Sequence, residues 1–284
     1  MFRVGIIGSE NSHALAFARI FNRMKKYDDI RVVAIYGEDE AASLKIHEEC
    51  GVEMMTPAEM LGKVDAIMVT SRNGKFHVPY VRPFIEAGIP AFIDKPIANC
   101  GKEAEEIIAL ARAKGVPVMG GSSTKIVKDT LEMKAIADEM KAAGELIGGH
   151  VFAPVNMIND YGNFYFYSSH LAEIVMTIFG YDPIAVTATR TATGVVATLE
   201  YEKFAVGMSY TEGAWKYGAT VLGKKNVALK EIGIADGYEA EVNHFVHMLR
   251  TGEVPQCDHD IVHPVKLLNA IERAYENGTR ELIG

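Results

Sequence analysis

The chain has 284 residues, of which 49% are hydrophobic and 23% are charged, a composition typical of a globular protein that buries a core. Its 29 basic and 37 acidic residues give a net charge of −8, which disfavours nucleic acid as a partner because no local basic stripe is present. The composition therefore favours a small-molecule partner.

Targeting and metal signals are weak throughout the sequence. No apolar run is long enough to span a bilayer, and the first residues lead directly into a strand-like run rather than a signal peptide, so we expect a cytoplasmic protein with no membrane partner. The three cysteines are widely spaced, which predicts neither disulfides nor a zinc site. Glu241, His244 and His247 fan around one helix without a fourth ligand, so no metal is expected.

Short apolar runs alternate with helical stretches from Phe2 to Gly120. Strands are predicted at 3–8, 31–36, 65–70, 90–94 and 116–120, and the first two helices at 12 to about 25 and at 39–50. Apolar strands separated by helices are typical of a parallel sheet covered on both faces. Residues 1–120 are therefore predicted to form a doubly wound Rossmann domain that binds a dinucleotide.

The pattern changes after Gly120-Gly121. A helix is predicted near 127–142, then strands with period-two alternation in the segments VTATRTATGVVATLEY, FAVGMSY and YGATVLG, and finally helices near 237–250 and 261–276. Residues 121–284 are thus predicted to form an α+β domain with a mostly antiparallel open sheet. We expect this domain to bind substrate and to form a homo-oligomer through its open sheet face.

The turn after the first strand, Gly8–His13, departs from the dinucleotide fingerprint G-x-G-x-x-G. Gly8 supplies the first glycine, but Glu10 and His13 occupy the second and third positions. Glu10 lowers the affinity for a pyrophosphate if it faces the phosphates, and does not if it turns toward solvent. The polar residues of the turn are expected to hydrogen-bond to the cofactor: Ser9, Asn11 and Ser12. In the alternative interpretation, Asn11 or Ser12 is only a helix cap.

The second strand is followed by Gly37 and Glu38. Glu38 stands one position later than the acid that normally binds the ribose hydroxyls, and could instead be a solvated residue at a helix start. No arginine is present here to bind a 2′-phosphate. The expected cofactor is NAD, with NADP disfavoured.

Two later strands end in polar residues, at the sheet edge where open α/β sheets bind ligands. The first strand end contributes candidate cofactor-binding residues: Thr70, Ser71, Arg72 and Asn73. The second ends in Asp94-Lys95-Pro96, in which the proline forces a turn, with a cis bond before it as one option. Lys95 would then point toward the nicotinamide.

Three segments of the chain resemble the glucose–fructose oxidoreductase/inositol dehydrogenase (Gfo/Idh/MocA) family: VGIIG, SRNGKFHVPYVRPFIEAGIPAFIDKPIA and SSHLAEIVMTIFG. A C-terminal pattern running from Glu241 through Phe245 to Gly252 extends the resemblance over most of the chain. The resemblance implies a Rossmann half, a sheet half and an NAD(P)-dependent oxidoreductase.

The resemblance also implies roles for single residues. The family's Glu-Lys-Pro motif corresponds to Asp94-Lys95-Pro96, so Lys95 is expected to be catalytic and to bind substrate, while Asp94, Pro96 and His77 are expected near the cofactor. A desolvated lysine beside a cationic nicotinamide has a lowered pKa and can take the proton of a substrate hydroxyl. A surface lysine at a strand end is the alternative interpretation.

The family pattern D-x-G-x-H-x-x-D corresponds to the segment Phe166–Glu173. His170 is retained and is expected to be catalytic and to contact substrate, and Glu173 is expected to orient it, whereas Phe166 replaces the first acid. A buried histidine bonded to the backbone is the alternative. Asn156 and Tyr165, in the aromatic approach to His170, are further candidates for contacting a sugar-like substrate, although the phenylalanines there fit core packing better.

The favoured function is a nicotinamide-dependent oxidoreductase in which Lys95 and His170 act on a hydroxyl or carbonyl of a sugar-, inositol- or polyol-like substrate. A dinucleotide-binding sensor or scaffold without dehydrogenase activity is the alternative, favoured by Glu10, His13 and Phe166. A third possibility is an enzyme that keeps its cofactor bound for elimination or hydrolysis.

Overall fold

The computed structural model describes all residues from Met1 to Gly284. Contacts within the chain divide it into two compact units. The first comprises Met1–Gly121 and Tyr238–Ile261, and the second comprises Ser122–Gly237 and Val262–Gly284. Each unit has its own sheet and its own apolar core.

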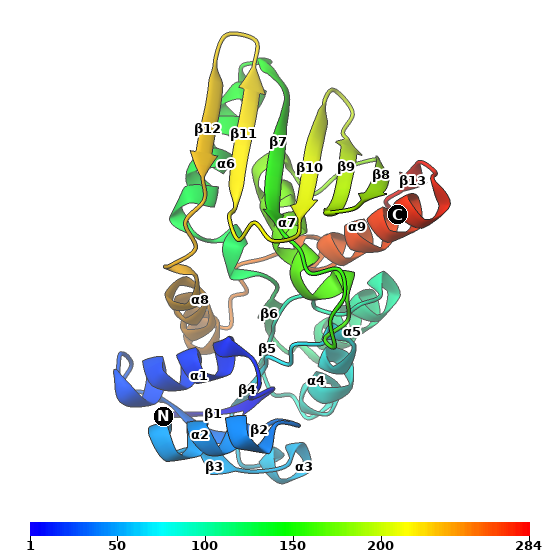
Figure 1. Ribbon diagram of the computed structural model, residues 1–284. Helices are drawn as coiled ribbons and strands as arrows, with labels where there is room; N and C mark the ends of the chain where they lie inside the picture. The colour runs from blue at the N-terminus through cyan, green and yellow to red at the C-terminus, as the bar shows by residue number, and fades with distance from the viewer. The chain divides into compact units, whose positions relative to one another are not determined.

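The first unit contains a six-stranded parallel sheet (Figure 1). Its strands are β1 (Phe2–Ile7), β2 (Ile30–Tyr36), β3 (Glu53–Met54), β4 (Ala66–Val69), β5 (Ala91–Ile93) and β6 (Val118–Gly120). Their order is β3-β2-β1-β4-β5-β6, in which the chain reverses direction across the sheet between β1 and β4. This is the doubly wound arrangement predicted from the apolar runs, and ligands of such sheets bind at the reversal.

Helices connect these strands: α1 (Ser12–Ala18), α2 (Glu40–Cys50), α3 (Pro57–Met60), α4 (His77–Glu86) and α5 (Gly101–Lys114). The first predicted helix is confirmed in part, because α1 passes into a π-helix at Arg19–Arg23. The boundaries of α2 follow from its sequence. Asp39 caps its start by accepting a hydrogen bond from the Ala42 backbone, and Gly51 ends it with a left-handed φ of 66°.

Helix α8 (Gly237–Thr251) lies in the C-terminal part of the sequence but packs on the first unit. Its residues Val242, Phe245 and Met248 share a core cluster with Phe17 and Phe92. This segment is predicted from the sequence to belong to the C-terminal domain, and the contacts of residues 238–261 with the first unit correct that prediction. The physical reason is the apolar face of α8, which finds its partners on β5 and α1 rather than on its neighbours in sequence.

The second unit contains a seven-stranded sheet in the order β12-β11-β7-β10-β9-β8-β13, which Figure 1 shows side by side. The strands are β7 (Leu146–Pro154), β8 (Ala185–Thr191), β9 (Gly194–Glu200), β10 (Ala205–Thr211), β11 (Gly218–Gly223), β12 (Val227–Glu231) and β13 (Glu281–Leu282). Its helices are α6 (Lys128–Ala142), α7 (Phe164–Phe179) and the main part of α9 (Asp258–Asn277). The predicted mostly antiparallel sheet is confirmed.

One detail of the predicted strand meander is wrong. Strand β7 was not predicted, yet it lies between β10 and β11 and pairs in parallel with β10. Two glycines, Gly148 and Gly149, interrupt the alternation of side chains in β7 and hide it from a pattern search. In the structure a Cβ at Gly149 would lie 2.3 Å from the Phe179 ring, so glycine is needed for α7 to pack on the sheet. No helix of the structure combines the length and the apolar character needed to cross a membrane.

Candidate active site

The carboxyl ends of β1, β4 and β5 are tied together by buried polar side chains. Thr70 donates to the Gly8 carbonyl at 3.0 Å, and the two ring nitrogens of His77 lie 2.7 Å from the Ser71 carbonyl and 2.6 Å from the Pro96 carbonyl. Burial lowers the pKa of His77, which lies next to Asp94. His77 therefore fixes the turn after β5, where the Lys95-Pro96 peptide bond is cis.

The first turn approaches β4 closely. A Cβ at Gly8, whose φ is +108°, would lie 2.2 Å from the Ser71 nitrogen, so only glycine fits. Glu10 does not simply turn toward solvent, because it bonds to the backbone that follows β4. Its Oε1 accepts a hydrogen bond from the Arg72 backbone nitrogen at 3.0 Å, and its Oε2 is buried without a hydrogen-bond partner. The carboxylate thus links the ends of β1 and β4.

The other candidates in this region also make internal hydrogen bonds. Ser9 donates to the Asp39 carbonyl, Ser12 shares a bond with the Tyr238 hydroxyl, and the Asn73 side chain caps a short 3-10 helix at Gly74–Phe76. Asn11 caps α1 by accepting from the His13 backbone, and its amide donates to Asp94 at 2.8 Å. Asn11 is thus a cap and also a link to the β5 end.

A cavity of about 390 Å³ lies at the carboxyl end of β2. Glu38 contributes to its wall and is held by the hydroxyls of Tyr80, at 2.8 Å, and Tyr36, at 3.3 Å. Glu40 and Glu59 also contribute, and no arginine or lysine does. An acidic cavity at this strand end suits the ribose hydroxyls of NAD and disfavours the 2′-phosphate of NADP.

Five buried or capping residues surround the end of β5, and we call them the Lys95 cluster: Asn11, His13, Asp94, Lys95 and Glu241. Asp94 is fully buried, and the exposed fractions of Glu241, Lys95 and His13 are 2%, 4% and 5%. Asp94 Oδ1 accepts from the Lys95 backbone nitrogen at 2.7 Å. The surface-lysine interpretation of Lys95 is therefore wrong, because its side chain is buried among ionisable groups.

Burial and charge act in opposite directions on the two bases of the cluster. Burial lowers the pKa of Lys95 and outweighs Asp94 and Glu241, which raise it, while Arg72 adds to the lowering. For His13 burial is again the largest influence and lowers the pKa, but Asp94 and Glu241 together outweigh it and raise the pKa above its usual value. The pKa values of His13 and Lys95 therefore lie closer together than those of an ordinary histidine and lysine.

Two carboxylates flank the ring of His13. His13 Nδ1 lies 3.5 Å from Asp94 and 3.0 Å from the Asn11 amide oxygen, while Nε2 lies 3.5 Å from Glu241. The two carboxylates thus face different nitrogens of one ring. One ligand atom from each of His13, Asp94 and Glu241 lies within 4.8 Å of the others, so the three side chains form one compact buried group.

A second cluster of polar residues lies in the second unit, around the start and middle of α7, and we call it the Glu173 cluster: Ser122, Thr124, Lys125, His170 and Glu173. His170 Nδ1 shares a 2.7 Å hydrogen bond with the Ser122 hydroxyl. Glu173 accepts from the Ser122 backbone at 3.1 Å and pairs with Lys125 at 3.1 Å. Glu173 therefore orients Lys125 and the Ser122 backbone, while the Ser122 hydroxyl orients His170.

The remaining candidates differ in their surroundings. Tyr165 is buried, donates to Glu272 at 2.6 Å and accepts from Asn269 at 2.7 Å, which are the contacts of a core residue. Phe166 is half-buried against the rings of Tyr161 and Tyr167. Asn156 is half-buried, and its carbonyl accepts from Asn159.

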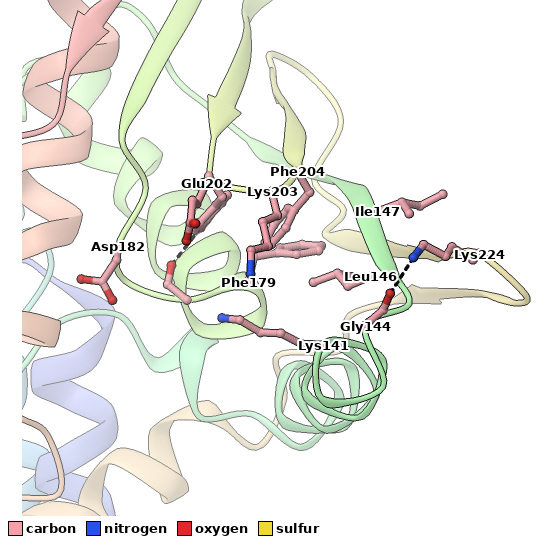
Figure 2. A pocket seen from close by; sticks show the side chains of 12 residues that line it. Lys141, Gly144, Leu146, Ile147, Phe179, Asp182, Glu202, Lys203, Phe204 and Lys224 are labelled. Carbon is pink, nitrogen blue, oxygen red and sulfur yellow. Dashed lines mark hydrogen bonds between the residues drawn. The ribbon is translucent and has the colours of Figure 1, made fainter.

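A larger cavity, of about 470 Å³, lies at the C-terminal end of α7 (Figure 2). Figure 2 shows Phe179 and Phe204 beside the side chains of Lys141 and Lys203, and Lys224 donates to the Gly144 carbonyl at 2.8 Å. None of the residues predicted from the sequence as catalytic, cofactor-binding or substrate-binding lines this cavity. The residues predicted to act in catalysis and binding therefore lie elsewhere, at the strand ends and in the two clusters.

Five members of these clusters were not predicted from the sequence, Thr124 among them. His13 was noted only as a missing glycine, and Glu241 only as part of a helical row with two histidines. In the structure Glu241 is buried against His13, whereas His247 is exposed and pairs with Glu253. Ser122 and Lys125 follow the Gly-Gly pair at the end of β6, and a polar run directly after a buried strand is the signal that could have found them.

Comparison with protein families gives one match. Residues 2–122 match the profile of the Gfo/Idh/MocA family, described as an oxidoreductase family with an NAD-binding Rossmann fold. The match confirms the resemblance drawn from the sequence motifs and the nicotinamide dinucleotide expected from it. A curated relative, dTDP-3,4-didehydro-2,6-dideoxy-alpha-D-glucose 3-reductase of Streptomyces antibioticus, is 27% identical over 120 residues. Those residues are 41% of this chain and 35% of the relative, so the chain matches about a third of that protein's length.

Solved structures resemble the chain over its whole length. GenD2 from gentamicin A biosynthesis, in complex with NAD, has a TM-score of 0.88 at 16% identity and covers 100% of this chain and 96% of its own. Scyllo-inositol dehydrogenase of Lactobacillus casei, with bound NAD(H) and scyllo-inositol, has a TM-score of 0.85 at 16% identity and covers 100% and 99%. At these identities the likeness shows a shared fold that includes both units.

Proposed function

We propose that the protein is an NAD-dependent oxidoreductase. The proposal is supported by the match of residues 2–122 to the Gfo/Idh/MocA oxidoreductase family with its NAD-binding Rossmann fold. The protein's substrate is a sugar-, inositol- or polyol-like molecule that reacts at a hydroxyl or carbonyl group. The observation that carries the proposal is Lys95, a buried lysine of lowered pKa at the end of β5 in an NAD-binding fold. The curated reductase and the inositol dehydrogenase structure support the substrate class.

The first unit has features that fit NAD. Glu38, in the acidic cavity at the β2 end, would hold the ribose hydroxyls, and the turn after Gly8 would face the pyrophosphate. Ser71, Arg72 and Pro96 lie at the adjacent strand ends and would border the nicotinamide half. Bound NAD supplies a hydride acceptor or donor. The negative charge of Glu10 repels the pyrophosphate and so weakens the affinity for NAD.

Lys95 would act on the proton of the reacting hydroxyl. Oxidation of a secondary alcohol releases one proton, which must go to a base. A neutral amine at neutral pH requires a lysine with a lowered pKa, and burial supplies that shift here. In the reduction direction the same group, protonated, returns the proton to the carbonyl oxygen.

His170 is the residue that we propose for substrate orientation and proton exchange in the second unit. Its Nδ1 shares a 2.7 Å hydrogen bond with the Ser122 hydroxyl, which fixes the orientation of the ring. Glu173 supports this arrangement indirectly, since it holds the Ser122 backbone. Asn156 is the remaining candidate for a polar contact with substrate.

The test is NAD reduction by purified protein with a panel of inositols, polyols, sugars and sugar acids. Wild type should turn over at least one of them. Lys95→Met should lose at least about 100-fold in kcat while its NAD affinity stays within a few-fold, because the amine acts on substrate rather than on the pyrophosphate. Turnover by Lys95→Met at the wild-type rate would contradict the role of Lys95. NAD binding without turnover of any substrate would favour the sensor or scaffold alternative.

We also propose that the chain forms a homo-oligomer through the face of its second sheet. Val196, Val227 and Leu229 are exposed on strands β9 and β12, with Leu229 exposed to 79%. Ala228, on the opposite side of β12, packs on the core, so these residues lie on the uncovered face. Sedimentation of wild type should give a species larger than a monomer, and Leu229→Glu should dissociate it. A monomeric wild type would contradict the proposal.

A further inference from the structure

His13 stands in the third position of the glycine fingerprint, where a glycine normally allows the helix to approach the strand. In this chain the position holds an imidazole that is 5% exposed. The ring is clamped edge-on by Tyr238, with centroids 4.6 Å apart, and by Phe17, with centroids 5.5 Å apart. A titratable group has therefore been built into the dinucleotide-binding turn and held in one orientation.

The carboxylates around His13 come from two distant parts of the sequence. Asp94 reaches Nδ1 from the end of β5, and Glu241 reaches Nε2 from α8, each at 3.5 Å. Both are buried, and Asp94 precedes Lys95 in the chain. Two buried carboxylates need positive charge nearby, because an uncompensated buried ion costs several kcal/mol.

Charged or titratable side chains from several elements act on the cluster: Asp94 and Lys95 of the β5 end, Glu241 and Tyr238 of α8, Arg72 after β4 and His77 of α4. If His13 were neutral, the two carboxylates would favour a proton on Lys95. A protonated His13 satisfies them, and the compensating proton on Lys95 is then no longer needed.

We propose that His13 is a positioning residue for the oxidoreductase reaction: protonated, it pairs with Asp94 and Glu241 and so allows Lys95 to stay neutral and accept the substrate's proton. The proposal rests on the proposed function only in that neutral Lys95 serves as the base of the oxidoreductase reaction. Asn11 completes the arrangement, since its amide group donates to Asp94 and its oxygen lies 3.0 Å from His13 Nδ1.

The test measures protonation directly and needs neither cofactor nor substrate. The C2–H resonance of His13 is identified by its loss in His13→Gln and is followed against pH by NMR. In wild type it should titrate above the usual histidine value. Glu241→Gln should move the titration down, and Lys95→Met should move it up, because Lys95 competes with His13 for the proton that the two carboxylates stabilise. The exposed His150 of β7 serves as the control and should not move.

The reciprocal measurement follows the Cε–Hε resonance of Lys95. His13→Gln keeps hydrogen-bonding capacity but cannot carry the charge, so the pKa of Lys95 should rise, and the acidic limb of kcat/KM for alcohol oxidation should move to higher pH with it. A His13 that titrates at its usual value and ignores Lys95→Met would overturn the proposal. So would an unchanged Lys95 titration in His13→Gln. Absence of turnover would instead bear only on the proposed function, because the NMR titrations do not depend on it.

Discussion

The Lys95 cluster and the Glu173 cluster each bury a histidine, a lysine and at least one carboxylate, but they connect them differently. In the Glu173 cluster, Lys125 has a carboxylate 3.1 Å away that is also held by a backbone N–H. In the Lys95 cluster, Asp94 and Glu241 both raise the pKa values of His13 and Lys95. The first arrangement fixes the position of a charge, whereas the second leaves the position of a proton adjustable.

The same residue types thus hold a charged lysine in place in one cluster and surround a lysine of lowered pKa in the other. A buried ion pair contributes mainly by avoiding an uncompensated charge, and breaking it leaves that charge buried. A shared cluster brings the pKa values of its bases closer together, as acid–base chemistry near neutral pH requires. The lysines of the two clusters should therefore respond differently to substitution, Lys125 mainly in stability and Lys95 mainly in activity.

The largest expected effect on stability comes from Lys125→Met. Glu173 would remain 3% exposed without its ammonium partner, which should cost about 3–5 kcal/mol in the free energy of unfolding. Lys134→Met is the matched control, since it breaks an exposed pair with Asp138 in the same unit and should cost less than about 0.5 kcal/mol.

Urea denaturation of both variants measures the difference, with Lys95→Met alongside. Lys95→Met should be closer to wild type than Lys125→Met, because His13 remains to compensate the carboxylates. Equal losses in Lys95→Met and Lys125→Met would remove the distinction between the clusters.

His170→Asn should lower kcat by about 10- to 100-fold if the ring exchanges a proton with substrate. Asparagine can still hydrogen-bond with Ser122 but cannot titrate, so a pH inflection that depends on His170 should disappear from the profile. Ser122→Ala, which removes the hydroxyl bonded to Nδ1, should give a smaller loss and keep the inflection. An identical profile in His170→Asn would make the histidine structural.

The pH dependence of stability should have opposite signs at His13 and His77. The pKa of His13 is raised in the folded state, so its contribution is fully present below 6.5 and is lost as the pH rises through the folded value. The pKa of His77 is lowered, so its contribution is present above 6.5 and is lost as the pH falls. Unfolding free energies of His13→Gln and His77→Gln between pH 5 and 8, relative to wild type, measure both slopes. Parallel slopes would contradict the assignment.

Glu10→Gln should give the smallest effect, a gain of about tenfold in NAD affinity at low salt. The amide oxygen can still accept from the Arg72 backbone, so the turn is preserved while the negative charge is removed. Glu48→Gln, an exposed site on α2, makes the same change in net charge and should leave the affinity unchanged. If both variants bind NAD equally well, the carboxylate of Glu10 does not act on the cofactor.

Patterns within short segments predicted the fold well. The apolar strands of the first unit and the alternating strands β8–β11 follow from residues that are neighbours in sequence. The strand-end motif likewise pointed to Lys95. The partners of Lys95 could not be found in this way, because Glu241 lies on a helix that joins the first unit only through tertiary packing. His13 was read as a loss of function, since a missing glycine says nothing about what the new side chain contacts.

Calorimetric titration of the wild-type protein with NAD and with NADP tests the central claim most directly. The account predicts a measurable heat with NAD at millimolar concentration or below, and weaker binding of NADP, because the acidic wall at Glu38, Glu40 and Glu59 repels a 2′-phosphate. Absence of heat and of thermal stabilisation with either dinucleotide would contradict the account, whatever the behaviour of the variants.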